Sequence, residues 1–270
     1  MDIRFQAGGP SKWKADAVIS FVFEGEDAEQ ACSVLMQNAL WLGIAPAWRD
    51  FRGKSGEMTM FYGPKAMELI RAAELSNLTP LCRVRDLSRS AVLKLLDVGA
   101  RGLIVPNIHS VEEVQQIIDY AKFAPIGQRG FCPTRKDGWG FDTERTTAET
   151  MAVMNEATLL LPQCETAEAL EHIEEIVALE GVDGVFIGPF DLSISMGIPG
   201  QFNHPDFVAA LANVQKACRD AGKFCMIFAG APAAVAERFQ QGYDSVAYGL
   251  DASVLIAAFK ANLADIRSKI

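Results

Sequence analysis

Residues 161–197 read LPQCETAEALEHIEEIVALEGVDGVFIGPFDLSISMG. Two short apolar runs in this stretch each end beside a carboxylate, because Glu165 follows LLLPQC and Asp191 follows VFIGPF. Helix-forming residues come after both runs, a pattern typical of parallel strands joined by helices. The carboxyl ends of parallel strands meet at one edge of a sheet or barrel, so Glu165 and Asp191 are predicted to lie together there. Paired carboxylates indicate a site for a hard divalent cation.

The alternation of strands and helices extends from about residue 65 to the end of the 270-residue chain. Apolar runs without polar alternation are typical of parallel strands buried on both faces. The sequence predicts strands at about 79–84, 102–105, 157–163, 183–188, 223–228 and 245–249. The predicted fold class is α/β. An open, doubly wound sheet is the alternative, but no G-x-G-x-x-G follows any strand.

A closed TIM (β/α)8 barrel needs two more strands than this region supplies. The first 64 residues contain two candidate strands, ADAVISFVF and GEMTMFYG, with the helix-forming run EDAEQACSVLMQNAL between them. We therefore predict a TIM barrel whose first two strands come from an atypical N-terminal β-α-β segment. The predicted division is residues 1–64 for that segment and residues 65–270 for the rest of the barrel.

Composition excludes several classes of function. The formal charge of −9 and the pI near 4.9 disfavour nucleic acid as a partner. The longest apolar runs are far shorter than the roughly 20 residues of a membrane span, so no membrane partner is expected. The N-terminus has no signal-peptide pattern, which favours a cytoplasmic location. The six cysteines include no C-x-x-C pair, which argues against a zinc ribbon.

The candidate site residues also have structural interpretations. Glu165 and Asp191 could each cap the helix that follows, although Thr166 is a better cap than Glu165. Arg83 ends the strand LTPLCRV, where it could bind a substrate carboxylate or pair with Asp86. Gln163 lies two residues before Glu165, so it shares the same side of the strand. Its amide could contact a substrate keto oxygen or support its neighbours by packing.

Six motifs together resemble the class II pyruvate aldolases of the HpcH/HpaI type. They read LTPLCRV, GARGLIVPNIHSVEE, GQRGF, LPQCETAEAL, GVDGVFIGPFDLSISMG and SVAYGLDASVL. The resemblance covers about residues 65–270 and implies a lyase that cleaves 2-oxo acids through a metal-stabilised pyruvate enolate. It also implies a homo-oligomer, either a trimer or a hexamer.

The same resemblance assigns roles to particular residues. It implies that Glu165 and Asp191 bind Mg²⁺, Mn²⁺ or Co²⁺. Arg83 and Gln163 would hold the pyruvate-like 2-oxo acid and serve in catalysis, and Gly188 and Phe190 would line the floor of the site.

One expected residue is missing from the pattern. The family carries an acid/base histidine after its second strand, and the matching place here is Met58. A thioether cannot relay a proton at neutral pH, so carbon–carbon cleavage is expected to be impaired. The alternative is a non-catalytic or chimeric barrel scaffold with a vestigial site. A lyase of the citrate-lyase β-subunit type is a further possibility, but no basic pocket for coenzyme A is evident.

The first 64 residues differ from the aldolase pattern as a whole. MDIRFQAGGPSKWKADAVISFVFEG and DFRGKSGEMTMFYGPKA resemble the start of the N-terminal domain of leucyl aminopeptidases of the M17 family. No peptidase ligand motif is present, so peptidase activity is not implied. The chain is interpreted as a natural fusion or an engineered chimera of two α/β folds.

Overall fold

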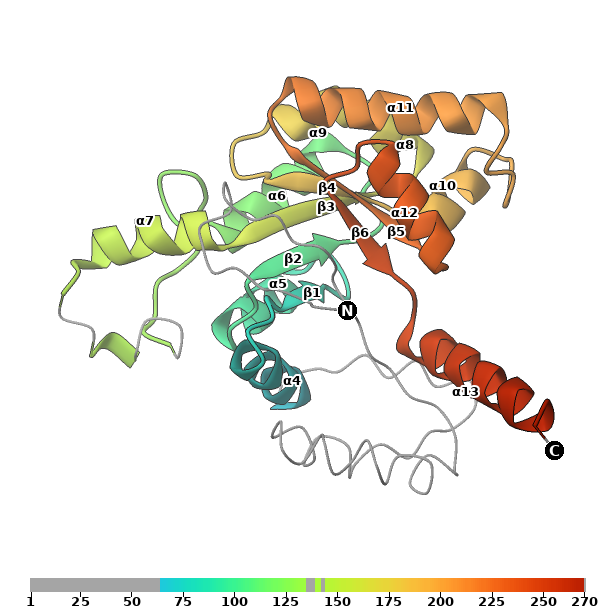
Figure 1. Ribbon diagram of the computed structural model, residues 1–270. Helices are drawn as coiled ribbons and strands as arrows, with labels where there is room; N and C mark the ends of the chain where they lie inside the picture. Colours follow the sequence, from blue (N-terminus) through green and yellow to red (C-terminus); the bar gives the residue numbers. More distant parts are fainter. Residues whose placement is uncertain (1–63, 135–138, 142–143, 270) are drawn as a thin grey trace.

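A computed structural model describes residues 64–134, 139–141 and 144–269. The predicted strands and helix of the first 64 residues, and their resemblance to aminopeptidases, lie outside this range apart from Pro64, which begins α4. The elements, labelled as in Figure 1, are α4 (Pro64–Leu75), β1 (Leu81–Arg83), α5 (Arg89–Asp97), β2 (Gly102–Val105), α6 (Val111–Ala121), α7 (Thr147–Ala157), β3 (Leu159–Cys164), α8 (Ala167–Glu171), α9 (Ile173–Ala178), β4 (Gly184–Ile187), α10 (Pro189–Ser195), α11 (Pro205–Asp220), β5 (Phe224–Ala229), α12 (Pro232–Gln240), β6 (Ser245–Tyr248) and α13 (Asp251–Arg267).

The strands form one parallel sheet in the order β1-β2-β3-β4-β5-β6. Every strand pairs with its neighbour in sequence, so the order never reverses as a doubly wound sheet requires. The six strands predicted from the sequence are confirmed to within two residues at each end. Within the described ranges the sheet is a half-barrel, and closure by residues 1–64 stays a prediction (Figure 1).

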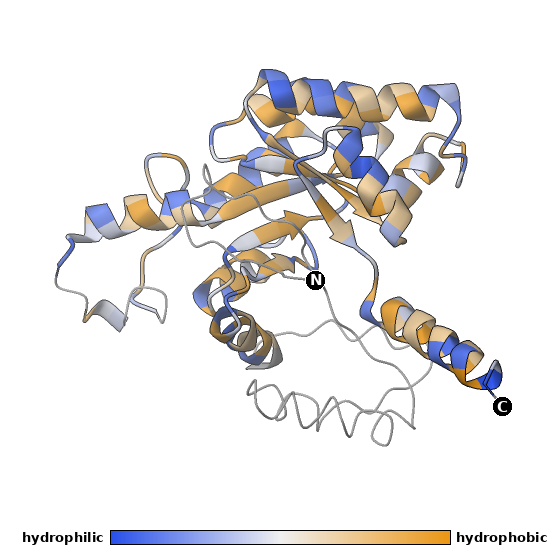
Figure 2. Ribbon diagram, in the orientation of Figure 1, coloured by the Kyte–Doolittle hydropathy of each residue, from blue (hydrophilic) through white to orange (hydrophobic). Residues whose placement is uncertain are grey.

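The two faces of the sheet bury different sets of side chains. Every second residue of β3, including Leu160 and Cys164, packs in the main core between the sheet and its helices. The intervening side chain of Leu161 points to the other face, where it forms a small cluster with Phe186 and Met226. The strands are apolar along their length, while the helices alternate polar and apolar residues (Figure 2). Burial on both faces therefore explains why the strands carry no alternating polar pattern.

Three helices begin at a side-chain cap. Ser88, Ser110 and Thr166 each accept a hydrogen bond from the first turn of α5, α6 and α8. The run TAEALEHIEEIVALE consists mainly of helix-forming residues, but His172 (φ −100°, ψ 14°) separates α8 from α9. Local propensity does not distinguish these two outcomes, because the residues on both sides of the break favour a helix.

A buried lysine ties together the amino-terminal ends of β3 and β4. Lys122 is 2% exposed, and its Nζ donates to the carbonyl oxygens of Asn155 and Thr158 at 2.9 and 2.5 Å. It also lies 3.1 Å from the Asp183 carboxylate, which accepts a second hydrogen bond from the Leu160 amide at 2.7 Å. The lysine therefore links the segment after α6, the end of α7 and the starts of two strands. It lies at the end of the sheet opposite to Glu165.

The last helix, α13, extends away from the sheet (Figure 1). Five of its large apolar side chains are exposed by 39% or more: Val254, Ile256, Phe259, Leu263 and Ile266. No helix in the described ranges is both long enough and apolar enough to cross a bilayer.

Candidate active site

A cavity of about 390 Å³ lies beyond the carboxyl ends of the strands. It brings together three predicted site residues from three different elements: Arg83 from β1, Glu165 after β3 and Asp191 from α10. The cavity is lined by Arg83, Asn107, His109, Glu165, Thr166, Asp191, Ile194 and Ser195. Parallel strands point their carboxyl ends the same way, so residues far apart in sequence meet in one cavity.

Glu165 is the most buried of the ionisable residues in this cavity, with 6% of its surface exposed. Its Oε1 accepts a hydrogen bond of 2.7 Å from the backbone N–H of Asn107. Burial raises the pKa of Glu165, and the nearby Asp191 carboxylate adds to this effect; the Asn107 N–H, Arg83 and Gln163 oppose it. Glu165 does not cap α8, because Thr166 does so, and that structural interpretation is wrong. The carboxylate is available for chemistry in the cavity.

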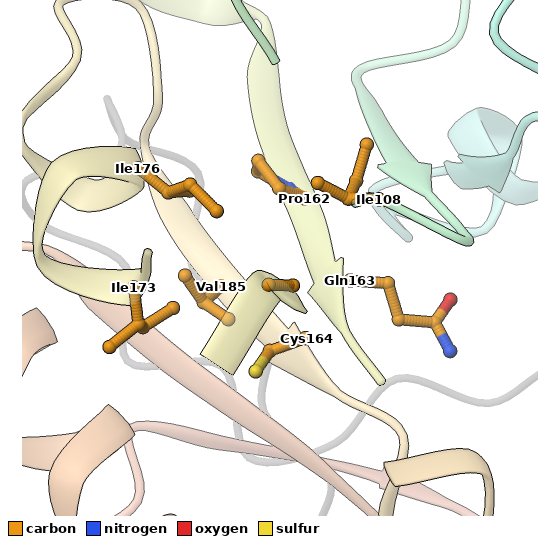
Figure 3. A pocket seen from close by; sticks show the side chains of 8 residues that line it. Ile108, Pro162, Gln163, Cys164, Ile173, Ile176 and Val185 are labelled. Atoms are coloured by element: carbon orange, nitrogen blue, oxygen red, sulfur yellow. The ribbon is translucent and has the colours of Figure 1, made fainter. Parts of the chain in front are cut away.

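Gln163 and Gly188 surround the second oxygen of Glu165. Gln163 points away from the apolar side chains packed on the other side of β3, as Figure 3 shows. Its Nε2 donates to Glu165 Oε2, whereas its buried Oε1 finds no hydrogen-bond partner among the residues that the structure describes. A Cβ placed on Gly188 would come within 2.8 Å of both Glu165 Oε2 and Gln163 Nε2. Glycine is therefore required at position 188 for this close packing.

Asp191 and Phe190 lie in the first turn of α10. Gly188 is the N-cap of this helix, so the interpretation of Asp191 as a cap is wrong. Asp191 is exposed and faces the cavity, while the Phe190 ring, 56% exposed, packs edge-on against Phe202 with centroids 4.8 Å apart. Asp191 thus joins Glu165 on the cavity wall.

Arg83 is exposed at the end of β1. The alternative pairing with Asp86 is not formed, because Asp86 binds Arg85 at 2.6 Å and the amide of Ser88 at 2.9 Å. The Arg83 guanidinium lies near enough to Glu165 to lower the pKa of that carboxyl. A cation at the cavity wall is suited to binding an anionic substrate group.

Five lining residues were not predicted as parts of a site: Asn107, His109, Thr166, Ile194 and Ser195. Thr166 Oγ1 donates to the Ile108 carbonyl at 2.5 Å, and Ser195 Oγ accepts from the Ala167 amide at 2.8 Å. The motif VPNIHS carried the signal for the first two, since it follows a strand end as LPQCET does.

Two carboxylates, Glu165 and Asp191, are a small set of protein ligands for a metal ion. Among the described residues, no three His, Cys, Asp or Glu side chains gather as a metal cage. Mg²⁺ and Mn²⁺ nonetheless bind through one or two carboxylates while keeping waters, so a pair of acids on a roomy cavity meets their needs.

The parallel strands follow one another around a half-barrel in sequence order, and a cavity with two carboxylates lies at their carboxyl ends. This arrangement defines the class of the protein as an α/β protein of the barrel type. Its family is shown by comparison: residues 63–258 match the model of HpcH/HpaI aldolase/citrate lyase, and the chain belongs to that family. This membership indicates a lyase of the aldolase type. The resemblance predicted over about residues 65–270 is confirmed for residues 63–258, whereas no comparison shows an aminopeptidase or a chimera.

Similar proteins agree with this assignment. The 2-keto-3-deoxy-L-rhamnonate aldolase of Salmonella gallinarum is 34% identical over 191 residues, which are 70% of each chain. The crystal structure of an HpcH/HpaI aldolase from Desulfitobacterium hafniense has a TM-score of 0.72 at 23% identity and covers 93% of both chains. That of an HpcH/HpaI aldolase/citrate lyase family protein from Burkholderia cenocepacia has a TM-score of 0.71 at 25% identity, covering 96% of this chain and 97% of the other.

Proposed function

We propose that this protein is a metal-dependent aldolase that cleaves 4-hydroxy-2-oxo acids to pyruvate and an aldehyde. The observation that carries the proposal is the single cavity shared by Arg83, Glu165 and Asp191. An arginine beside two carboxylates offers an anion anchor next to a cation site. The 34% identity to proteins named 2-keto-3-deoxy-L-rhamnonate aldolase supports a substrate that is a polyhydroxylated 2-oxo acid.

The residues in the cavity fit a divalent cation. Glu165 is buried in surroundings that raise its pKa, so a cation would offset the cost of keeping its charge. The buried Gln163 Oε1 lacks a partner among the described residues, and Gly188 leaves room beside Glu165 Oε2. Glu165 and Asp191 would hold Mg²⁺, Mn²⁺ or Co²⁺, and such an ion supplies Lewis-acid stabilisation of developing negative charge.

The chain's own groups would bind and orient the substrate. Arg83 would hold the carboxylate or keto oxygen of the 2-oxo acid through paired hydrogen bonds. Gln163 keeps Glu165 in place through its Nε2 and would turn its free amide oxygen toward the ligand shell. Phe190 and Gly188 would complete the floor of the site, because they precede Asp191 at the start of α10.

A calorimetric and kinetic experiment tests the proposal. Wild-type protein should bind Mn²⁺ and release pyruvate from 2-keto-3-deoxy sugar acids, and a chelator should stop the release. Glu165→Gln and Asp191→Asn should both lose Mn²⁺ binding; in chelator Asp191→Asn should melt like the wild type, because Asp191 is exposed. Unchanged Mn²⁺ binding in both variants would show that the metal binds at another site and would refute the proposal.

The alternative function is a non-catalytic scaffold with a vestigial site. It is favoured by the methionine at position 58, where the family resemblance expects a histidine. A wild-type protein that binds Mn²⁺ but cleaves nothing, together with a Met58→His variant that gains cleavage, would support this alternative. Cleavage by the wild type would refute it.

We also propose that the protein is a cytoplasmic homo-oligomer, either a trimer or a hexamer. A separate proposal is that residues 1–64 supply the first two strands of a closed barrel. The exposed apolar side chains of α13 support assembly. The sheet supports closure, since β1 and β6 each have only one paired neighbour in the described ranges. Removing residues 1–63 should cause aggregation through these open edges; a soluble, cooperatively folded fragment would refute closure.

A further inference from the structure

Hydrogen bonds hold the loop that carries His109 beside the cavity lined by Glu165 and Asp191. The loop runs from the end of β2 to α6, and Asn107 within it has a left-handed φ of 55°. Its backbone is fixed at three successive residues: the Asn107 N–H donates to Glu165, the Ile108 carbonyl accepts from Thr166, and the His109 N–H donates to Glu113 Oε2 at 2.7 Å. The position of the imidazole is therefore coupled to that of the Glu165 carboxylate.

The imidazole is accessible from the cavity. His109 lines the same space as Arg83, Glu165 and Asp191, and 45% of its side chain is exposed. The other two histidines of the chain do not line it. They lie by carboxylates of neighbouring turns instead, His172 Nδ1 at 3.0 Å from Glu175 and His204 Nδ1 at 3.7 Å from Asp206.

A second carboxylate lies close to the ring. The Nδ1 of His109 lies 3.6 Å from Glu168 Oε1, in the first turn of α8. A base whose one nitrogen faces a carboxylate presents its other nitrogen to a reactant, which is the arrangement of many proton-transfer dyads. Here that arrangement would leave Nε2 of His109 for a reactant in the cavity that His109 lines.

We propose that His109 exchanges the proton of the substrate hydroxyl, with Glu168 as its positioning residue; this rests on the proposed aldolase function. In the cleavage direction, Nε2 takes the proton from the hydroxyl on C4 of the 4-hydroxy-2-oxo acid. The C4–O electrons form the aldehyde carbonyl, the C3–C4 bond breaks, and its electron pair enters the C2–C3 enolate of pyruvate. The imidazolium then returns the proton to C3, so no net proton or oxidant is needed.

If His109 carries this proton, the reaction does not require a histidine at position 58. Imidazole is the side chain best suited to give and take a proton near neutral pH. One imidazole on the cavity wall suffices for a proton that leaves an oxygen and returns to a carbon of the same substrate.

The test compares two reactions of one holoenzyme. Retro-aldol cleavage removes a hydroxyl proton, whereas decarboxylation of oxaloacetate gives the same enolate without one. With Mn²⁺ bound, His109→Gln should lower kcat for cleavage by roughly 100- to 10,000-fold. Its KM and its decarboxylation rate should stay near those of the wild type. Glu168→Gln should show a smaller loss of the same kind.

The control is His172→Gln, which removes an exposed imidazole that also lies beside a carboxylate on a helix. Cleavage that persists in His109→Gln, or an equal fall in both reactions, would overturn the assignment. Wild-type decarboxylation with no cleavage of any 4-hydroxy-2-oxo acid would also overturn it. Absence of both reactions from the wild type would instead refute the proposed function, and this inference with it.

Discussion

At position 188 the absence of a side chain decides how closely two polar groups can approach. A Cβ added to residue 188 would lie only 2.8 Å from Glu165 Oε2 and 2.8 Å from Gln163 Nε2. Its φ is not left-handed, so the requirement for glycine comes from space and not from backbone conformation.

Gly188→Ala should therefore push Glu165 away from its present position. We expect Mn²⁺ affinity to fall about 10- to 100-fold, the range found when groups supporting metal ligands are altered. Titration calorimetry measures this directly. Gly230→Ala is a matched control, because a Cβ there meets only Phe228 at 3.9 Å. Equal Mn²⁺ affinity in both variants would show that Glu165 is not a ligand.

At the scale of single residues, the structure brings three of the predicted site residues, Arg83, Glu165 and Asp191, to one cavity, and Gln163 lies against Glu165. Each follows or ends an apolar run, so its place at the edge of the sheet could be inferred. His109 was missed because its place depends on hydrogen bonds of the two preceding residues. The Asn107 N–H donates to Glu165 and the Ile108 carbonyl accepts from Thr166, each across 58 positions of the chain. Local sequence pattern contains no record of such contacts.

At the scale of elements, Lys122 is the main polar link among α6, α7, β3 and β4. Burial lowers the pKa of its amine, while Asp183 acts in the opposite direction. A buried ammonium is tolerated only when its hydrogen-bonding capacity is filled, and three oxygens do so here.

Lys122→Met should destabilise the fold by about 3 kcal/mol or more, since two carbonyls and a carboxylate lose their partner. Urea denaturation followed by circular dichroism measures the change. Lys216→Met, which removes an exposed lysine paired with Asp220 on α11, should change stability little. Similar values for the two variants would mean that Lys122 is not an anchor.

The strands were predicted accurately because a short, continuous apolar run in an α/β fold is typical of a strand buried on both faces. The break between α8 and α9 at His172 could not be predicted from the sequence, since no glycine or proline signals it. Lys122 was also invisible in the sequence, because a lysine after an amphipathic helix normally lies in solvent.

At the scale of the whole molecule, α13 is the least covered element of the described chain. Phe259 and Leu263 are 45% and 48% exposed and lie one turn apart on the same side of the helix. Exposed apolar groups gathered on one helix mark an interface more often than a free surface.

The double variant Phe259→Glu, Leu263→Glu should dissociate the proposed oligomer. Light scattering coupled to size-exclusion chromatography should show the mass falling from a multiple of 29.4 kDa to a single chain. Lys260→Glu, which changes charge on the same exposed helix, should leave the mass unchanged. A wild-type protein that is already monomeric would contradict the assembly.

The position of Lys122 has a practical consequence. Because only 2% of this residue is exposed, an amine-reactive reagent should leave it unlabelled while the sheet is intact. Loosening of β3 from β4 would uncover it and make it react. Mass spectrometry of the peptide that contains Lys122 would then report the separation of these two strands directly, without a dye, a tag or an activity assay.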